Sequence, residues 1–251
     1  MQVGLIGSGN MARALARGWG RPVLCSDVLP ERARALAEET GGDAFEDNAE
    51  LASRADVVVL CHKPAQVAAI AEEVAPVAKA VASILGGVKL ADLRAAYPDR
   101  PVYRFLPSTP VEVREGVVVQ AITPEQEPGL DVRVQDLFGE LGVLVRLDES
   151  LVDVAMGLMS NAPAYVALVA EAQIDAGVRR GLPADTAAEL VVQTLTGTAE
   201  LLRRRHYDTL AVRREVTSPG GSTARGLDAL ERGGLRTAFS DALDAVVGGR
   251  R

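Results

Sequence analysis

Residues 2–12 read QVGLIGSGNMA, an apolar strand-like run followed by the spacing G-x-G-x-x-A and the start of a helical pattern. A strand, a glycine turn and a helix in direct succession are typical of dinucleotide-binding sheets. Gly7 permits the tight turn, Gly9 lets the backbone approach a pyrophosphate, and Ala12 lets the helix pack against the strand. The helix N-terminus offers unpaired N–H groups to the phosphates. We favour this interpretation over an ordinary tight turn, because strand, helix and a later acidic residue are all present.

Short strand-like runs alternate with helical patterns as far as residue 148. Repeated β–α units imply a largely parallel sheet covered by helices on both faces. The run Asp56–Cys61 is almost continuously apolar, which predicts a central strand. We therefore predict an α/β fold, with a Rossmann-type doubly wound parallel sheet as a dinucleotide-binding domain over residues 1–148. The expected strands are Gln2–Ile6, Val23–Asp27, Asp56–Cys61, Ala80–Ile84, Pro101–Phe105, Gly116–Ile122 and Gly142–Leu147, and the expected helices are Met11–Trp19, Glu31–Thr40, Gln66–Ala75 and Glu125–Leu141.

After Asp148 the strand pattern stops and helical periodicity replaces it, so residues 149–251 are predicted to form an all-α dimerisation and substrate-binding domain. The long helix Pro183–His206 carries an apolar stripe wider than a small bundle buries alone. We therefore predict a homodimer and leave open a larger assembly built from dimers. The stripe contains Ala187, Leu190, Val191, Thr194, Leu195, Thr198, Leu201 and Leu202, and the other expected helices are Glu149–Ser160, Pro163–Arg180, Thr209–Val216, Thr223–Glu231 and Leu235–Val247.

Composition and charge exclude several classes of protein. Apolar residues make up 48% of the 251 residues and charged residues 24%, as in an ordinary globular protein. The net charge of −7 argues against nucleic acid as the main partner. The longest uncharged run, Val154–Ala170, has 17 residues and is interrupted by Asn161 and Pro163, so we expect no membrane span.

The rare residue types narrow the chemistry further. Cys25 and Cys61 are the only cysteines, which excludes a disulfide scaffold. His62 and His206 are the only histidines, so a His-rich metal site is excluded and no metal is predicted. Residues 1–9 carry no leader-like pattern, and we expect a cytoplasmic protein.

Two predicted strand ends carry candidate nucleotide-binding residues. Asp27 follows Gly7 by 20 residues, where a carboxylate takes the ribose 2′-OH and repels a 2′-phosphate. Alternatively, Asp27 caps the helix that begins near Pro30, and the choice between NADH and NADPH stays open. His62-Lys63-Pro64 follows Asp56–Cys61, where a nicotinamide or a substrate carboxylate should lie, although a solvated loop lysine is equally consistent with this position. We expect the His62 ring to pack or face solvent rather than act as an acid or base.

The loop Ser218–Thr223 (SPGGST) lies between two predicted helices. Its two glycines allow unusual backbone angles, and the N–H groups of the helix that starts near Thr223 would point into the loop and form a carboxylate site. Ser222 and Thr223 add two hydroxyl donors. A plain Ser or Thr helix cap is the simpler alternative, but this sequence is more elaborate than a cap requires.

Several motifs, taken in chain order, resemble those of one known family. The sharpest is Val216–Thr223, which Gly226-Leu227 and Leu230-Glu231 follow; the others are Gly7–Ala12 with its Asn10-Met11, Lys63-Pro64, Ser83–Gly87, and Asp175–Val178 with Gly181–Pro183. In this order and over essentially the whole chain, they resemble the pyrroline-5-carboxylate reductases.

The resemblance implies hydride transfer from NADH or NADPH to the C=N carbon of 1-pyrroline-5-carboxylate, which gives L-proline in the last step of proline biosynthesis. It implies that the catalytic Thr223 hydrogen-bonds the imine nitrogen, and that this loop meets the nicotinamide across a dimer of helical domains. The implied substrate contacts are Val216, Ser218, Gly220, Gly221, Ser222, Thr223 and Lys63. The implied cofactor contacts are Gly7, Ser8, Gly9, Asn10, Met11, Asp27, Asn48, His62, Lys63 and Pro64.

Three alternative functions are compared with the sequence, and the first of them conflicts with it. A β-hydroxyacid dehydrogenase would need a lysine in the helical domain, and residues 90–251 contain none. A reductase of a different cyclic imine stays open, because Ser108 and Ser160–Ala162 depart from the family pattern. A nucleotide-binding regulatory paralogue without turnover is the third alternative, and the presence of Lys63 and Thr223 argues against it.

Overall fold

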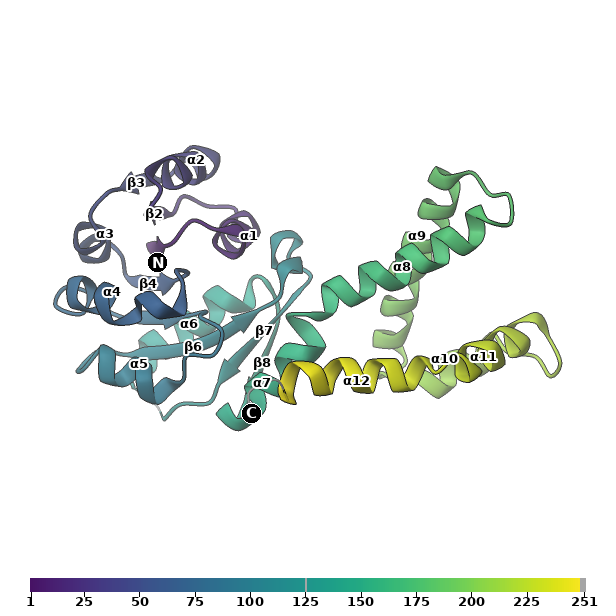
Figure 1. The fold of residues 1–251 in the computed structure, drawn as a ribbon. Coiled ribbons are helices and arrows are strands. Elements are labelled where there is room, and N and C mark those ends of the chain that lie inside the picture. The colour runs from purple at the N-terminus through teal and green to yellow at the C-terminus, as the bar shows by residue number, and fades with distance from the viewer. Residues whose placement is uncertain (125, 249–251) are drawn as a thin grey trace. The chain divides into compact units, whose positions relative to one another are not determined.

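The computed structural model describes residues 1–124 and 126–248, and the chain divides into two compact units, Met1–Pro163 and Ala164–Arg251 (Figure 1). The sequence boundary between residues 148 and 149 marks the end of the last strand. The first unit continues through helix α7 (Glu149–Met159), because its Val152 and Met159 pack into the core beneath the sheet. The helical sequence pattern therefore begins one helix before the second compact unit.

The first unit contains an eight-stranded sheet in the order β3-β2-β1-β4-β5-β6-β7-β8. All pairs are parallel except β6–β7, which is antiparallel, so β7 and β8 run opposite to the other strands. This arrangement confirms the predicted doubly wound sheet, with β4 fully buried between β1 and β5. The strands are β1 (Val3–Ile6), β2 (Leu24–Ser26), β3 (Asp43–Phe45), β4 (Val57–Leu60), β5 (Val81–Ser83), β6 (Val102–Pro107), β7 (Gly116–Ala121) and β8 (Gly142–Leu147).

Helices cover both faces of the sheet, and alternate residues along each strand face opposite cores. Leu5 and Val59 face one core, to which α1, α2 and α6 contribute, whereas Leu60 faces the other, to which α3, α4, α5 and α7 contribute. The described helices of this unit are α1 (Asn10–Trp19), α2 (Pro30–Thr40), α3 (Asn48–Arg54), α4 (Val67–Val74), α5 (Leu90–Ala96), α6 (Pro128–Gly139) and α7, with short 3₁₀ turns at Pro64–Gln66 and Thr109–Val113.

Three short elements of the first unit were absent from the sequence prediction. They are β3, α3 and α5, none longer than seven residues. Only Phe45 of β3 is buried, so this edge strand has no apolar alternation to reveal it. Helix α3 is specified mainly by its cap, since the Asp47 side chain accepts the N–H groups of Ala49 and Glu50. The predicted helix Glu125–Leu141 corresponds to α6; its first residue lies outside the described residues.

A buried cation joins the sheet to α7. Arg104 lies on β6 and is 3% exposed. Its guanidinium donates to Glu149 at 2.8 Å and to Asp153 at 3.4 Å, and the Glu149 carboxylate also accepts the Leu90 N–H at 2.7 Å. One buried charge therefore connects β6, α5 and the helix that ends the first unit.

The second unit is entirely helical in its described residues. Its helices are α8 (Ala162–Val178, which starts at the end of the first unit), α9 (Ala184–Arg204), α10 (Thr209–Glu215), α11 (Ser222–Arg232) and α12 (Leu235–Gly248). Among them, only Ala187 and Val212 are buried. Large apolar side chains that are more than a third exposed include Val166, Leu168, Leu190, Val192, Leu210, Leu230 and Phe239.

One segment, Glu149–Val178, is long and apolar enough to cross a membrane by length and composition alone, with a hydropathy of 1.4. The sequence analysis expected no membrane-spanning helix because it considered only runs without any charged residue. By length and mean hydropathy, that expectation is not met. The structure divides the segment at Ser160-Asn161 into α7 and α8, and α7 packs against the sheet.

We expect Arg104→Met to lower the free energy of unfolding by about 2–4 kcal/mol, because it leaves two carboxylates partly buried without their cation. Urea denaturation measures this loss. Arg34→Met is the matched control, since Arg34 pairs with Glu46 on an exposed surface and its loss should cost less than about 1 kcal/mol. Equal losses in the two variants would contradict a structural role for the Arg104 cluster.

Candidate functional site

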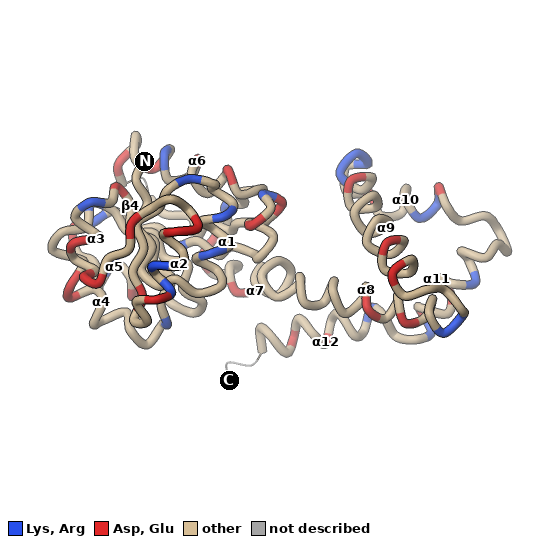
Figure 2. The backbone as a smooth tube through the Cα atoms, turned by 90° about the horizontal axis from the view of Figure 1, so that it is seen from above, with Lys and Arg blue, Asp and Glu red and all other residues tan. Residues whose placement is uncertain are grey.

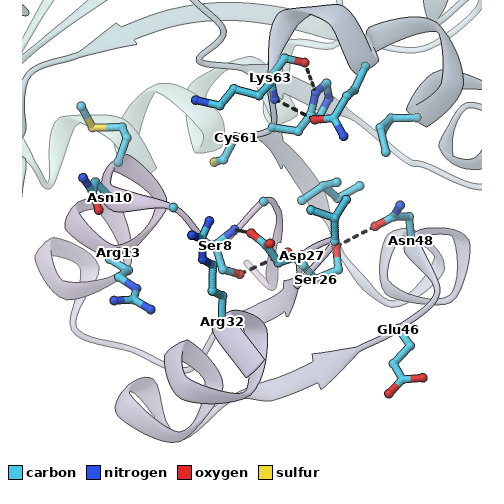
Figure 3. A pocket seen from close by; sticks show the side chains of 18 of the residues that line it. Ser8, Asn10, Arg13, Ser26, Asp27, Arg32, Glu46, Asn48, Cys61 and Lys63 are labelled. Carbon is cyan, nitrogen blue, oxygen red and sulfur yellow. Dashed lines mark hydrogen bonds between the residues drawn. The ribbon is translucent and has the colours of Figure 1, made fainter. Parts of the chain in front are cut away.

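A cleft of about 790 Å³ lies at the carboxyl ends of β1, β2 and β4, and we name it the β1 cleft (Figure 3). The strand order reverses at β1, since β2 and β4 lie on either side of it. Ligands of doubly wound sheets bind at such switch points. The β1 cleft is lined by Ile6, Gly7, Ser8, Gly9, Asn10, Met11, Arg13, Ser26, Asp27, Val28, Arg32, Glu46, Asn48, Cys61, His62, Lys63, Gln66, Ile70 and Glu73.

Gly7 and Gly9 of the turn are glycines for different structural reasons. Gly7 has φ of +99°, and a Cβ there would lie 2.8 Å from the backbone of Cys61 and His62. Gly9 is the N-cap of α1, has no side-chain cap, and has nothing within 4 Å of a built Cβ. The open space above Gly9 and the uncapped helix N-terminus fit a pyrophosphate that approaches the backbone. The residues present therefore fit a dinucleotide.

Asp27 is connected to the glycine turn. Its Oδ2 accepts the N–H of Ser8 at 2.7 Å, and its Oδ1 accepts the N–H of Leu29 at 2.9 Å. Leu29 is the N-cap of α2, and its own side chain makes no cap hydrogen bond. Asp27 therefore binds the N–H at the start of α2 and also joins the ends of β1 and β2 inside the cleft, which is compatible with both interpretations of this residue.

The segment after β4 lines the same cleft with His62 and Lys63, whereas Pro64 does not line it. Since a carbonyl oxygen only accepts, His62 Nδ1 donates to the Lys63 carbonyl at 2.9 Å. Burial lowers the pKa of His62, which favours a neutral ring. Burial also raises the pKa of the Cys61 thiol, which disfavours its thiolate form. Lys63 is exposed.

The cleft brings together nine of the ten residues that the resemblance implied for cofactor contact. Among them, Asn48 makes two hydrogen bonds through its side-chain amide. Its Oδ1 accepts from the Ser26 hydroxyl at 2.7 Å, and its Nδ2 donates to the Glu73 carboxylate at 2.8 Å. Sequence reasoning missed the two cleft arginines, Arg13 and Arg32. Their position inside predicted helices gave no signal, because exposed helical arginines are common.

The SPGGST loop lies in the second unit and precedes α11. Gly220 has φ of +69°, in the left-handed region that favours glycine, and a Cβ on Gly221 would lie 2.4 Å from Ser218 Oγ, so a side chain there would displace the Ser218 hydroxyl. The N-cap of α11 is Gly221, which has no side chain, and the helix itself begins at Ser222. Neither Ser222 nor Thr223 is therefore the cap residue of this helix. The Thr223 side chain is exposed and makes no hydrogen bond within the described residues. Val216, also exposed, ends α10 just before this loop.

The departures from the family pattern have local explanations in the first unit. Ser108 Oγ accepts the Val117 N–H at 2.9 Å and donates to the Val117 carbonyl at 3.2 Å. Ser160 Oγ donates to the Pro107 carbonyl at 3.4 Å. Both hydroxyls are thus used to hold the loop after β6 and are not free for a ligand.

Comparisons with known families give consistent matches for both halves of the chain. Residues 149–250 match the family described as pyrroline-5-carboxylate reductase dimerisation, and residues 2–87 match the one described as NADP oxidoreductase coenzyme F420-dependent. Pyrroline-5-carboxylate reductases of Synechocystis and Thermus thermophilus are 35% and 36% identical to the chain, over 98% of its length and 96% of theirs.

Solved structures give the same match. Plasmodium falciparum pyrroline carboxylate reductase with NADP bound has a TM-score of 0.88 at 26% identity, covering 99% of this chain and 96% of its own. The Streptococcus pyogenes 1-pyrroline-5-carboxylate reductase has a TM-score of 0.89 at 28% identity, covering 99% and 97%. The similarity therefore extends over both units.

We expect Gly9→Asp to fold normally and lose dinucleotide binding. Aspartate is a favourable N-cap residue that differs from glycine there by only roughly a few tenths of a kcal/mol, whereas its carboxylate would occupy the phosphate position and repel a phosphate. A fluorescence titration with the reduced dinucleotide and a melting curve measure the two effects. Gly9→Asn is the control that adds similar volume without charge and should weaken binding less. Unchanged affinity in the aspartate variant would contradict a phosphate site at this helix end.

Proposed function

Because the chain belongs to the pyrroline-5-carboxylate reductase family, we propose that it transfers hydride from NADH or NADPH to the imine carbon of 1-pyrroline-5-carboxylate, giving L-proline. The observation that carries the proposal is the pair of uncapped helix N-termini. One lies above Gly9 in the β1 cleft, and the other follows the two glycines of the SPGGST loop. The first suits a pyrophosphate and the second a small carboxylate.

The bound dinucleotide supplies the hydride, and the residues of the chain position the two reactants. In the β1 cleft, the first N–H groups of α1 hold the pyrophosphate and Asp27 accepts from the ribose. The free amides of Ser222 and Thr223 at the start of α11 hold the substrate carboxylate. Holding the reactants in near-attack geometry supplies most of the catalysis.

The Thr223 hydroxyl donates a hydrogen bond to the imine nitrogen, which then accepts charge more readily. A threonine hydroxyl is too weak an acid to protonate the product alone, so a water molecule relays the proton. No hydrogen bond within the described residues competes for this hydroxyl. Lys63, exposed at the edge of the β1 cleft, adds positive charge beside the cofactor or the substrate carboxylate.

Self-association belongs to the same proposal. Residues 149–250 match a dimerisation family, and the second unit leaves most of its apolar side chains exposed. We propose that a second copy of the chain, rather than lipid, covers them, including the apolar face of α8. Figure 2 shows Lys and Arg interspersed with Asp and Glu, which suits neither a nucleic acid nor an anionic membrane as partner.

The free thiols of Cys25 and Cys61 support a cytoplasmic location, because the cytoplasm is reducing and keeps thiols unpaired.

A steady-state assay of pyrroline-5-carboxylate with NADH and with NADPH tests the activity. Turnover with either cofactor is expected. Faster turnover of a six-membered cyclic imine would favour the alternative substrate, which stays open because Ser108 and Ser160–Ala162 depart from the family pattern. No turnover of any imine by protein that binds the dinucleotide would indicate a regulatory paralogue.

Thr223→Ala should reduce kcat by roughly 5- to 150-fold, because it removes one transition-state hydrogen bond worth about 1–3 kcal/mol. The melting temperature should hold, since Gly221 and not Thr223 caps α11. Thr223→Ser keeps the hydroxyl and should retain most of the turnover. A loss of stability with unchanged kcat would assign Thr223 a structural role instead.

Leu190→Asp should dissociate the homodimer, because Leu190 lies on the apolar stripe of α9 and is 54% exposed in the single chain. Light scattering at micromolar concentration measures the assembly size. Val132→Asp is the matched control: Val132 is 57% exposed on α6 of the first unit, and its change should leave the dimer intact. A wild-type protein that is monomeric at this concentration would contradict the proposed assembly.

A further inference from the structure

The nucleotide choice of the β1 cleft depends on the carboxylate of Asp27. This residue follows β2, beside the switch point, where the adenine ribose of a bound dinucleotide lies. Both of its oxygens accept backbone N–H groups, from Ser8 at 2.7 Å and from Leu29 at 2.9 Å. Because two main-chain contacts hold it, turning the carboxylate out of the cleft to make room for an anion would break both hydrogen bonds.

The same two contacts leave acceptor capacity for a ligand. A carboxylate offers about four lone-pair sites, and the two backbone N–H groups occupy half of them. A ribose 2′-OH can donate to a remaining site, whereas a 2′-phosphate would place its charge beside a fixed negative group. No ion pair within the described residues neutralises Asp27.

The opposing consideration is the positive charge of the cleft. Arg13 and Arg32 both line it, and neither guanidinium donates a hydrogen bond or forms a salt bridge within the described part of the chain. Figure 3 shows Arg32 on the same side of the cleft as Ser8 and Asp27. Arg32 is an exposed, long side chain at the start of α2, so holding a phosphate would cost it rotamer freedom. Asp27 is already fixed, and we expect its repulsion to decide the preference.

We propose that the β1 cleft takes NADH in preference to NADPH, with Asp27 as the specificity-determining residue and Arg32 as a cation that serves a 2′-phosphate only when Asp27 is removed. The proposal rests on the function proposed above, and it fixes the reductant that this function left open.

Equilibrium binding tests it without relying on turnover. Dihydronicotinamide fluorescence should give a dissociation constant for NADH roughly tenfold or more below that for NADPH, the scale expected of a like-charge contact. In competition on the wild-type protein, 5′-ADP should bind more tightly than 2′,5′-ADP, which needs no variant. Equal or tighter binding of NADPH and of 2′,5′-ADP would overturn the proposal.

Variants then assign the preference to residues. Asp27→Ser should move the ratio toward NADPH by about tenfold or more, and Asp27→Asn, which keeps an acceptor for one backbone N–H, should do the same with less effect on melting temperature. Adding Arg32→Ala to Asp27→Ser should remove the gained NADPH affinity. An unchanged ratio in both folded Asp27 variants would overturn the assignment. NADH preference without imine turnover would refute the proposed function alone, whereas binding of neither dinucleotide would refute both.

Discussion

The approach of Gly7 to the backbone of Cys61 and His62 is the constraint on which the β1 cleft depends. No side chain fits there, since a Cβ would lie 2.8 Å from main-chain atoms of the neighbouring strand end. The turn is closed from the other side as well, because the Gly7 N–H donates to the Ser26 carbonyl at 2.9 Å. One glycine without a side chain thus brings three strand ends together, and the free N-terminus of α1 follows directly from its turn.

The fold was predictable from the sequence where strands and helices are strongly buried. The prediction missed short elements that one or two residues specify. The continuous apolar run of β4 identified a central strand because both of its faces are buried. In contrast, α3 depends on the Asp47 cap and β3 on the burial of Phe45 alone. Neither leaves a periodic signal. The end of the first unit was also hidden, because helical periodicity in α7 cannot reveal that Arg104, on a strand far away in sequence, pairs with its carboxylates.

The candidate site divides in the same way. The sequence predicted those site positions that the backbone determines, since few residues can replace the glycines of a turn or a carboxylate at a strand end. It could not predict whether a polar side chain is free to bind a ligand, because that depends on the three-dimensional structure. Ser108 and Thr223 are both hydroxyl residues beside glycine or proline turns, yet the Ser108 hydroxyl is used twice by Val117 while the Thr223 hydroxyl is unused in the described chain. A sequence pattern specifies which donors exist, but not which of them the fold already consumes.

The exposed apolar surface of the second unit links stability to assembly. A helix gains most of its stability from packing an apolar face, yet α8, α11 and α12 bury no residue in the single chain. Each fully buried leucine or valine side chain contributes about 1.5–3 kcal/mol, so a second copy supplies stabilisation that the chain alone lacks. The folded state of this unit is then inseparable from protein concentration. Because the SPGGST loop leads directly into α11, the conformation of this uncapped helix N-terminus depends on the same association.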